Sequence, residues 1–411
     1  MRIADSRAAI SGRREDGQAS LRILQTAAEF EEFREIWSAW SNGPEADVDL
    51  FSIHLRHRQK AVRPHAMVVY RNGRPDCMLL GWLDQGTVAF KVGSLALFRS
   101  DARILRFVNG GFLGNQSREN SEFLLGEILR SLRQREAQAA TFSQLRADSP
   151  LFDLAKREPN LFCRDHFTPF QTHWYQTLPS GFEEYFNGLT TKKRKEFKRH
   201  VRMMERDFPG IVRFESVRNT RDVEDFACKA DEISRKTHKH ALGAGFVNNL
   251  ETRETLVAAA QKGALRACLL YLGERPIAFA IGILSNKTLH GTLTGYDPGL
   301  RQYGPGLQSM MRLMEESFEP SGEILRFDAG CGDSSYKREI FGSSWKEAPV
   351  WIFAPSTKGL SMNVRKVVST VLHSFAMKSL EKSERLRKIK KLWHRRAQQN
   401  FNEGASGRWL R

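Results

Sequence analysis

The sequence predicts an α/β (α+β) protein of two tandem domains, each a mixed, mostly antiparallel sheet flanked by helices. The chain has 411 residues, more than one hydrophobic core usually contains, so two domains are expected. Short apolar runs separated by turn residues occur in the same order in both halves. A Tyr-x-x-x-Arg-Pro stretch begins at Tyr70 and again at Tyr271, 201 residues later. The shared order of apolar runs and the shared Tyr-x-x-x-Arg-Pro stretch favour an internal duplication.

In the first half, apolar residues at helical spacing predict a helix over 27–40, and the polar turn 71–75 predicts a hairpin. The expected elements are a helix at 27–40, strands at 67–70, 77–83 and 104–108, a glycine-rich turn (Gly110, Gly111, Gly114), a helix at 121–132, a strand at 140–145 and a helix at 151–156.

The second half repeats this order and ends in a basic segment. The expected elements are strands at 265–272, 277–284 and 288–295, a helix at 306–318, a strand at 324–329, a short helix after Asp333 and a strand at 350–353. We therefore expect a loose arm at 1–20, an N-terminal domain at 21–178, a C-terminal domain at 179–358 and a basic helical tail at 359–411.

Charge and cysteine usage restrict the possible functions. The formal net charge of +17 attracts anions, whether phosphates, coenzymes, nucleic acid or an acidic membrane surface. Five scattered cysteines match no metal-ligand spacing, so we expect no metal site and reduced thiols. The first twenty residues lack the apolar run of a secretory signal, which predicts a cytoplasmic protein, with the inner face of the membrane as a further location.

The segment 379–396 carries eight lysine and arginine residues, and two interpretations are open. It is either a solvated helix packed through Leu386, Ile389 and Leu392, or a surface helix attracted to anionic lipid or nucleic acid. No aromatic-interleaved surface of a known RNA-binding type appears in the sequence, so no specific nucleic acid is expected.

A glycine-containing loop before the helix 306–318 is the clearest candidate ligand site. Glycine lets the backbone approach a ligand, and the free N–H groups and dipole of a helix start attract anions. Arg301 adds a positive charge, so the loop is suited to a diphosphate, although the glycines alone would also make a tight turn. The loop residues are Arg301, Gln302, Tyr303, Gly304, Pro305 and Gly306.

Two segments resemble a known family. Arg301-x-x-Gly304-x-Gly306 resembles the pyrophosphate loop of the GNAT acetyltransferase superfamily. The segment 327–337 looks like the Asp-x-Gly-x-Gly-x-x-x-Tyr-Lys signature of the CelD-like acetyltransferases, tandem relatives of the Fem peptidyltransferases that are associated with cellulose and other exopolysaccharides. The likeness covers roughly residues 180–355, and it departs from the family at His238, where tryptophan is usual.

The resemblance implies tandem GNAT domains and acetyl-CoA, or another acyl-CoA, as co-substrate. The first half has no arginine at the matching offset from Gly110, Gly111 and Gly114, so we expect it not to bind coenzyme.

Four residues are candidates for the chemistry. The resemblance places Tyr336 where a tyrosine donates a proton to the coenzyme sulfur, with a packing role as the alternative. Asp328 and Asp333 flank a glycine-rich turn, where either could act as base or acceptor anchor, although Asp333 could equally cap a helix. Strand alternation puts His290 on one face with Tyr296, as a base or as a structural histidine.

A cluster of cations opens the helix that follows Thr190. Positive charges in a first helical turn oppose the helix dipole, so an external anion would compensate them; the alternative is an exposed basic face. The candidate substrate-binding residues are Lys193, Arg194, Lys198, Tyr296 and Lys337.

The sequence therefore predicts an acyltransferase that moves an acetyl or longer acyl group from acyl-CoA to an amine, in preference to a hydroxyl, of an amine-bearing sugar, lipid or other envelope or exopolysaccharide precursor. Contact with an anionic membrane is compatible with the charge. Two alternatives are a Fem-like peptidyltransferase that uses aminoacyl-tRNA and a non-catalytic polyanion- or membrane-binding adaptor on this fold.

Overall fold

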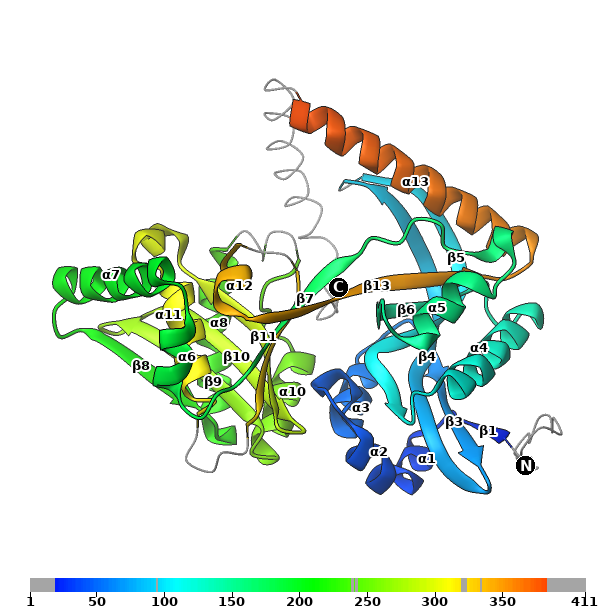
Figure 1. Ribbon diagram of the computed structural model, residues 1–411, viewed down its shortest axis with the longest axis horizontal. Helices are drawn as coiled ribbons and strands as arrows, with labels where there is room; N and C mark the ends of the chain where they lie inside the picture. The colour runs from blue at the N-terminus through cyan, green and yellow to red at the C-terminus, as the bar shows by residue number, and fades with distance from the viewer. Residues whose placement is uncertain are drawn as a thin grey trace.

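The computed structural model describes residues 19–93, 95–237, 240, 243–318, 324–332 and 335–382. It has two lobes of sheet and helices, joined by two long strands that run between them (Figure 1). Most of the expected arm at 1–20 and much of the expected tail at 359–411 lie outside the described residues.

The first lobe is built mainly from the elements before residue 164. They are β1 (Ala19–Leu24), α1 (Ala27–Glu32), α2 (Arg34–Trp40), the 3-10 helix η1 (Pro44–Ala46), α3 (Val48–Arg56), β2 (Ala61–Pro64), β3 (Ala66–Arg71), β4 (Arg74–Val92), β5 (Leu95–Gly114), α4 (Arg118–Arg133), β6 (Ala139–Arg146), α5 (Pro150–Arg157) and η2 (Leu161–Cys163).

The remaining elements build the second lobe and close the first. They are β7 (Gln171–Thr177), α6 (Phe182–Gly188), α7 (Thr191–Asp207), β8 (Val212–Val217), η3 (Thr220–Asp222), α8 (Val223–Arg235), α10 (Leu250–Gln261), β9 (Leu265–Leu272), β10 (Arg275–Ser285), β11 (Thr288–Tyr296), η4 (Pro298–Tyr303), α11 (Pro305–Glu315), β12 (Arg326–Cys331), α12 (Ser335–Ile340), β13 (Ser343–Phe353) and α13 (Thr357–Lys382).

The strands form one continuous sheet in the order β1-β3-β4-β5-β6-β13-β7-β12-β11-β10-β9-β8, with β2 paired to β4. Two strands cross between the lobes. β7 pairs with β12 of the second lobe, and β13 pairs with β7 through its first residues and with β6 through Glu347–Phe353. The expected strand at 350–353 therefore exists but completes the first lobe. The domain boundaries at 178 and 358 stay predictions.

The two halves repeat the same connectivity, as the duplication predicts. β3-β4-β5-α4-β6 corresponds to β9-β10-β11-α11-β12, and in each half the third and fourth strands are parallel. The hairpin registers also match, because Tyr70 pairs with Pro75 and Tyr271 pairs with Pro276.

Each lobe buries apolar side chains on both faces of its sheet. In the first lobe, α4 and α5 cover one face around Phe107 and Phe142, and α1 to α3 cover the other around Trp37 and Phe51. In the second lobe, α8 and α10 cover one face, while α6, α7 and α11 cover the other. Both faces are buried, which explains the near-continuous apolar runs of β9 and β10.

Two expectations for the first half were wrong. The helix at 27–40 is broken at Phe33, whose backbone (φ −105°, ψ 1°) leaves the helical region. The glycines at 110, 111 and 114 belong to β5 instead of a turn, because β4 and β5 form a hairpin that extends far beyond the apolar runs. Because much of this hairpin is polar, its apolar runs alone predict strands that are too short.

Candidate active site

The strands β11 and β12 run side by side and then separate, which opens the sheet in the second lobe. Their parallel pairing ends at His290 and Asp328. Beyond that point β11 stays paired with β10 as far as Tyr296, while β12 stays paired with β7 as far as Cys331. The opening, which we call the strand fork, therefore has His290 and Asp328 at its closed end.

A buried histidine links two carboxylates at this closed end. His173 Nε2 lies 2.7 Å from Asp328 Oδ1, and His173 Nδ1 lies 3.0 Å from Glu347 Oε2. The His173 ring stacks on Trp345 with centroids 4.1 Å apart, and Trp345 Nε1 donates to Glu347 Oε2 at 3.1 Å. Burial opposes the charged imidazole, but the two carboxylates outweigh it and raise the pKa of His173 to about 9. We therefore take His173 as an imidazolium at neutral pH.

The carboxylates of this group stay ionised. Burial alone would raise the pKa of Asp328, but hydrogen bonding to His173 lowers it below its ordinary value. The pKa of Glu347 is lowered in the same way. Asp328 Oδ1 also accepts a hydrogen bond of 2.7 Å from the Gly330 backbone N–H.

His290 is held as a neutral imidazole beside this pair. Its Nδ1 lies 3.6 Å from Asp328 Oδ2, and burial lowers the pKa of His290 against the attraction of Asp328. Its Nε2 is buried without a hydrogen-bond partner among the described residues. An orphaned buried nitrogen is costly, and it marks the strand fork as a functional candidate.

Glu45, on η1 of the first lobe, is influenced by the charges of Glu347 and His173. Burial, reinforced by the charge of Glu347, raises the pKa of Glu45 to about 7, against the attraction of His173. Part of the Glu45 surface still reaches solvent. Among the described residues beside the strand fork, Glu45 is therefore a carboxyl group whose proton affinity suits general-base work at neutral pH.

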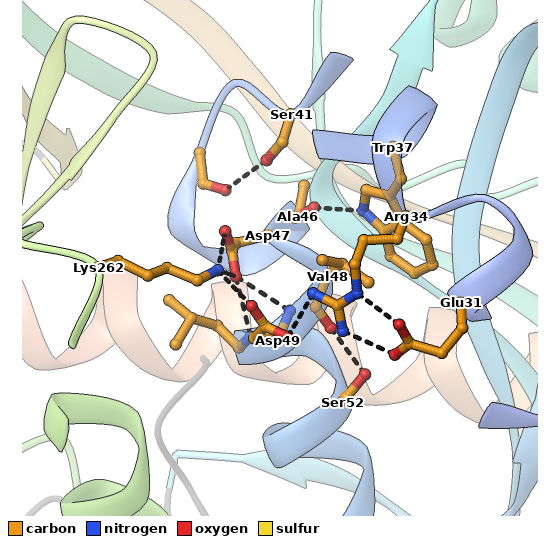
Figure 2. A network of polar contacts seen from close by, with 12 residues as sticks. Glu31, Arg34, Trp37, Ser41, Ala46, Asp47, Val48, Asp49, Ser52 and Lys262 are labelled. Carbon is orange, nitrogen blue, oxygen red and sulfur yellow. Dashed lines mark hydrogen bonds and ion pairs between the residues drawn. The ribbon is translucent and has the colours of Figure 1, made fainter. Parts of the chain in front are cut away.

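An ion-pair network between the lobes fixes the turn that carries Glu45 (Figure 2). Lys262 of the second lobe contacts Asp47 Oδ1 at 2.6 Å and Asp49 Oδ2 at 2.7 Å. The Asp47 side chain also caps α3 by accepting from the N–H groups of Asp49 and Leu50. Trp37 Nε1 donates to the Ala46 carbonyl at 2.7 Å. The residues that directly follow Glu45 are therefore held by buried or bridging contacts.

The cysteine at the end of β12 is unsuited to nucleophilic work. Burial and the charge of Glu347 raise the pKa of the Cys331 thiol to about 12, so it stays protonated. Among the described residues, no group of three or more His, Cys, Asp or Glu is arranged to hold a metal ion.

His290 and Tyr296 lie on opposite faces of the sheet, so the expected shared face was wrong. The β10–β11 pairing shifts between Ile281 and Gly282, which leaves Thr292 as an extra residue and reverses the alternation. Tyr296 consequently packs with Tyr303 on the α11 face, while His290 pairs with Ile283 of the opposite face.

The glycine loop leads from β11 into α11 as expected. Gly304 adopts a left-handed conformation with φ +59°, and Pro305 occupies the first helical position. A Cβ at Gly304 would lie 2.5 Å from His200 Nδ1, and one at Gly306 would lie 2.7 Å from the Tyr296 ring. The glycines are thus required by packing against the protein's own side chains as well as by backbone conformation.

The other loop residues divide into anchors and exposed groups. Tyr303 is buried and donates to Asp207 Oδ2 at 3.0 Å, while Asp297 accepts from the Gly299 N–H at 2.9 Å and pairs with Arg275. Arg301 and Gln302 are exposed. The first backbone N–H to bond within α11 is that of Gln308, so the amides of Gly306 and Leu307 precede the helical pattern.

Three candidate substrate cations on α7 have contacts within the protein. Lys193 is buried, and its Nζ pairs with Glu196 at 3.0 Å and Glu339 at 2.8 Å, which raises its pKa against burial. Arg194 donates to the Asn187 carbonyl at 3.0 Å. The Lys198 Nζ lies 5.6 Å from the centre of the Phe186 ring. For Lys193, internal carboxylates supply the compensation that we expected from an external anion.

An open pocket of about 650 Å³ lies between α7 and α12. Tyr336 lines this pocket. The Tyr336 side chain also packs against the hydrophobic core beneath α11, on the opposite face of β12 from Asp328. Lys337 Nζ instead donates to the carbonyls of Ala329 (2.6 Å), Gly330 and Cys331, so it ties α12 to the end of β12. Asp333 lies outside the described residues. The pocket is lined by Lys192, Lys193, Lys195, Glu196, Arg199, Tyr336 and Glu339.

The counterpart of the glycine loop in the first lobe is closed by its own side chains. Ser117 caps α4 by accepting from the Asn120 N–H. The Asn120 side chain donates to Asp76 Oδ2 at 2.6 Å, which leaves a carboxylate beside this helix start. A negative charge there disfavours an anionic ligand.

The sequence predicted Asp328 and His290 as candidate site residues, but it did not predict His173, Glu347 or Glu45. A charged or imidazole side chain within an alternating strand was the only signal for His173 and Glu347, and nothing around Glu45 marked it. The structure unites these five residues, while Tyr336 and the glycine loop lie on the other face.

Comparisons with known proteins agree with this architecture. Residues 191–338 match the model of the family described as acetyltransferase (GNAT) domain. A crystal structure of FemX superposes with a TM-score of 0.55 at 9% identity, over 82% of this chain and 98% of that chain. This chain therefore shares the fold of FemX over most of its length, and residues 191–338 are similar to a GNAT acetyltransferase domain, which supports a transferase.

Two further solved structures superpose with lower TM-scores. A tandem GNAT protein from the clavulanic acid biosynthesis pathway has a TM-score of 0.48 at 12% identity, over 82% of this chain and 100% of that chain. L-PGS from Bacillus licheniformis has a TM-score of 0.46 at 12% identity, over 83% of this chain and 96% of that chain. No sequence among the curated proteins matches this chain.

Proposed function

We propose that the protein transfers an acyl group from acyl-CoA to an amine at the strand fork. The observation that carries this proposal is the separation of β11 from β12 directly beyond His290 and Asp328. The opening is bordered by a strand that leads into the left-handed Gly304 and helix α11. An acyl donor held at that helix would reach His173, Asp328 and Glu347 through the opening between β11 and β12.

The loop has the donors that a coenzyme diphosphate requires. The Gly306 and Leu307 amides precede the first intrahelical hydrogen bond, and the exposed Arg301 adds a charge. When bound, acyl-CoA would supply the activated thioester. The pocket beside Tyr336 is lined by four cations and two carboxylates, and its remaining positive charge would receive a further anionic part of the donor. The closed helix start at Ser117 supports the expectation that the first lobe does not bind coenzyme.

Glu45 is the proposed general base. Its carboxyl group has a pKa of about 7, and it is partly exposed, whereas Asp328 and Glu347 are ionised and committed to His173. Deprotonation of an amine by a group of this proton affinity is efficient at neutral pH. Asp328, His290 and His173 would then position the acceptor. Tyr336, on the opposite face, would donate the proton that the leaving thiolate needs.

The charges of the site support an amine acceptor. Two carboxylates, those of Asp328 and Glu347, contact the His173 imidazolium, and a third carboxyl group, that of Glu45, interacts with it electrostatically. A cationic ammonium is attracted to such a site before it loses its proton. We infer that the acceptor is an amine-bearing sugar, lipid or other envelope or exopolysaccharide precursor, which is the class that the CelD-like segment 327–337 implies.

Calorimetric titration with acetyl-CoA tests the proposal, with Arg301→Ala as variant and Arg221→Ala, exposed on η3, as matched control. We expect micromolar binding that weakens about tenfold in Arg301→Ala, or roughly 1.4 kcal/mol, and does not change in Arg221→Ala. No binding at millimolar acetyl-CoA would contradict it. Aminoacyl-tRNA transfer and polyanion binding would then be the functions to test.

A further inference from the structure

The helix α13 lies along the outer edge of the first lobe, beside the β4–β5 hairpin (Figure 1). One side of the helix is fixed to this hairpin. Met362 packs with Phe90, Arg365 donates to the Arg99 carbonyl at 3.0 Å, and His373 Nδ1 accepts from the Gly93 N–H at 3.0 Å. These contacts orient the helix and determine which of its residues face solvent.

The opposite side of α13 presents a line of apolar side chains. Val364 is 62% exposed, Val368 37%, Leu372 45% and Phe375 65%. Their spacing of four, four and three residues places them on one face over roughly 16 Å of helix. We call these four residues the outer stripe. Single exposed apolar residues are ordinary, but a line of four on a helix that is anchored on its other side indicates an interaction surface.

The charge of the protein is concentrated in the same part of the chain. Residues 357–411 contain fourteen lysine and arginine residues and three acidic residues, which gives +11 of the total +17. Between 357 and 380 the sequence has no acidic residue. Along the sequence, the outer stripe is therefore followed by positively charged residues, and no acidic residue lies within or directly beside it.

We propose that the outer stripe of α13 docks on an anionic lipid bilayer. Apolar side chains on one face of a helix insert into the boundary between headgroups and acyl chains, and neighbouring lysine and arginine residues are attracted to anionic lipid. Nucleic acid fits less well, because phosphate contacts use cations and hydrogen bonds, and the stripe offers neither. No helix among the described residues is long and apolar enough to span a membrane. Because one side of α13 is held against the β4–β5 hairpin and the other carries the stripe, α13 would lie in the membrane plane.

Sedimentation of the full-length protein with lipid vesicles tests this surface. We expect binding to vesicles of phosphatidylcholine with phosphatidylglycerol, at least tenfold weaker binding to pure phosphatidylcholine, and weakening as salt rises. The double variant Leu372→Glu/Phe375→Glu should bind the anionic vesicles at least tenfold more weakly. Leu250→Glu is the matched control, because Leu250 is 63% exposed at the start of α10 in the other lobe.

Three results would overturn the proposal. The first is no binding of the wild type to anionic vesicles at low salt. The second is equal binding by the double variant, with circular dichroism showing that both proteins are folded, since the basic segment alone would then be responsible. The third is a wild-type dimer, by light scattering, that the double variant makes monomeric while vesicle binding is unchanged.

Discussion

His173 Nε2 lies 2.7 Å from Asp328 Oδ1, although the two residues are 155 positions apart in the sequence. The contact exists because β7 lies between β12 and β13, so that a strand preceding the second lobe is paired on both sides by strands from the end of the chain. The charged group therefore depends on the exchange of strands between the lobes.

The first prediction concerns the dependence of stability on pH. The pKa of His173 is raised from 6.5 to about 9, so its ion pairs stabilise the fold fully below pH 6.5 and are lost as pH rises through 9. Relative to His173→Gln, the wild type should lose up to about 3 kcal/mol of unfolding free energy between pH 6.5 and 10. Chemical denaturation of both proteins at each pH measures this, and parallel curves would contradict it.

Glu45→Gln should reduce kcat/KM by about a hundredfold or more, because the base is removed while its shape is kept. In the wild type, kcat/KM should rise as Glu45 ionises near pH 7 and then level off, and the variant should lack this rise. Acyl-CoA affinity should not change. Glu274→Gln, whose side chain is 99% exposed, is the control. An unchanged pH profile in Glu45→Gln would assign the base to another residue.

Gly304→Ala should be more harmful than Gly273→Ala, although both glycines have a positive φ, of +59° and +57°. An alanine at 273 meets open space, whereas one at 304 meets His200. We expect about 1 kcal/mol of destabilisation at 273 from backbone strain and about 2–3 kcal/mol at 304. Thermal unfolding measures both. His200→Ala should recover part of the loss at 304, and a lack of recovery would disprove the clash.

Lys193→Met should destabilise the protein by about 2 kcal/mol, because Glu339 and Glu196 lose their shared buried cation. Lys195→Met, two positions along the same helix but exposed, should change stability by less than about 0.5 kcal/mol. Lys195 should instead affect anion binding, since it lines the pocket beside Tyr336. Equal stability changes in the two variants would show that the Lys193 ion pairs contribute little.

Much of the second lobe could be predicted from local pattern. The strand at 265–272 has the predicted bounds, and those at 277–284 and 288–295 differ by at most two residues, because buried strands give uninterrupted apolar runs between clear turns. The length of the β4–β5 hairpin was underestimated, since its polar and apolar residues alternate beyond the apolar runs at 77–83 and 104–108. The break at Phe33 had no glycine or proline to mark it.

The sequence by itself predicted the tandem α/β architecture, the glycine loop at 304–306, and Asp328 and His290 as candidate site residues. These features depend on residue type and short spacing, which a single sequence records. Only the tertiary structure decided that His173, Glu347 and Glu45 join them, and that Lys193 is compensated within the protein. The physical reason is that pairing of strands distant in the chain, and the pKa values that follow from burial and neighbouring charges, arise only once both lobes are folded together.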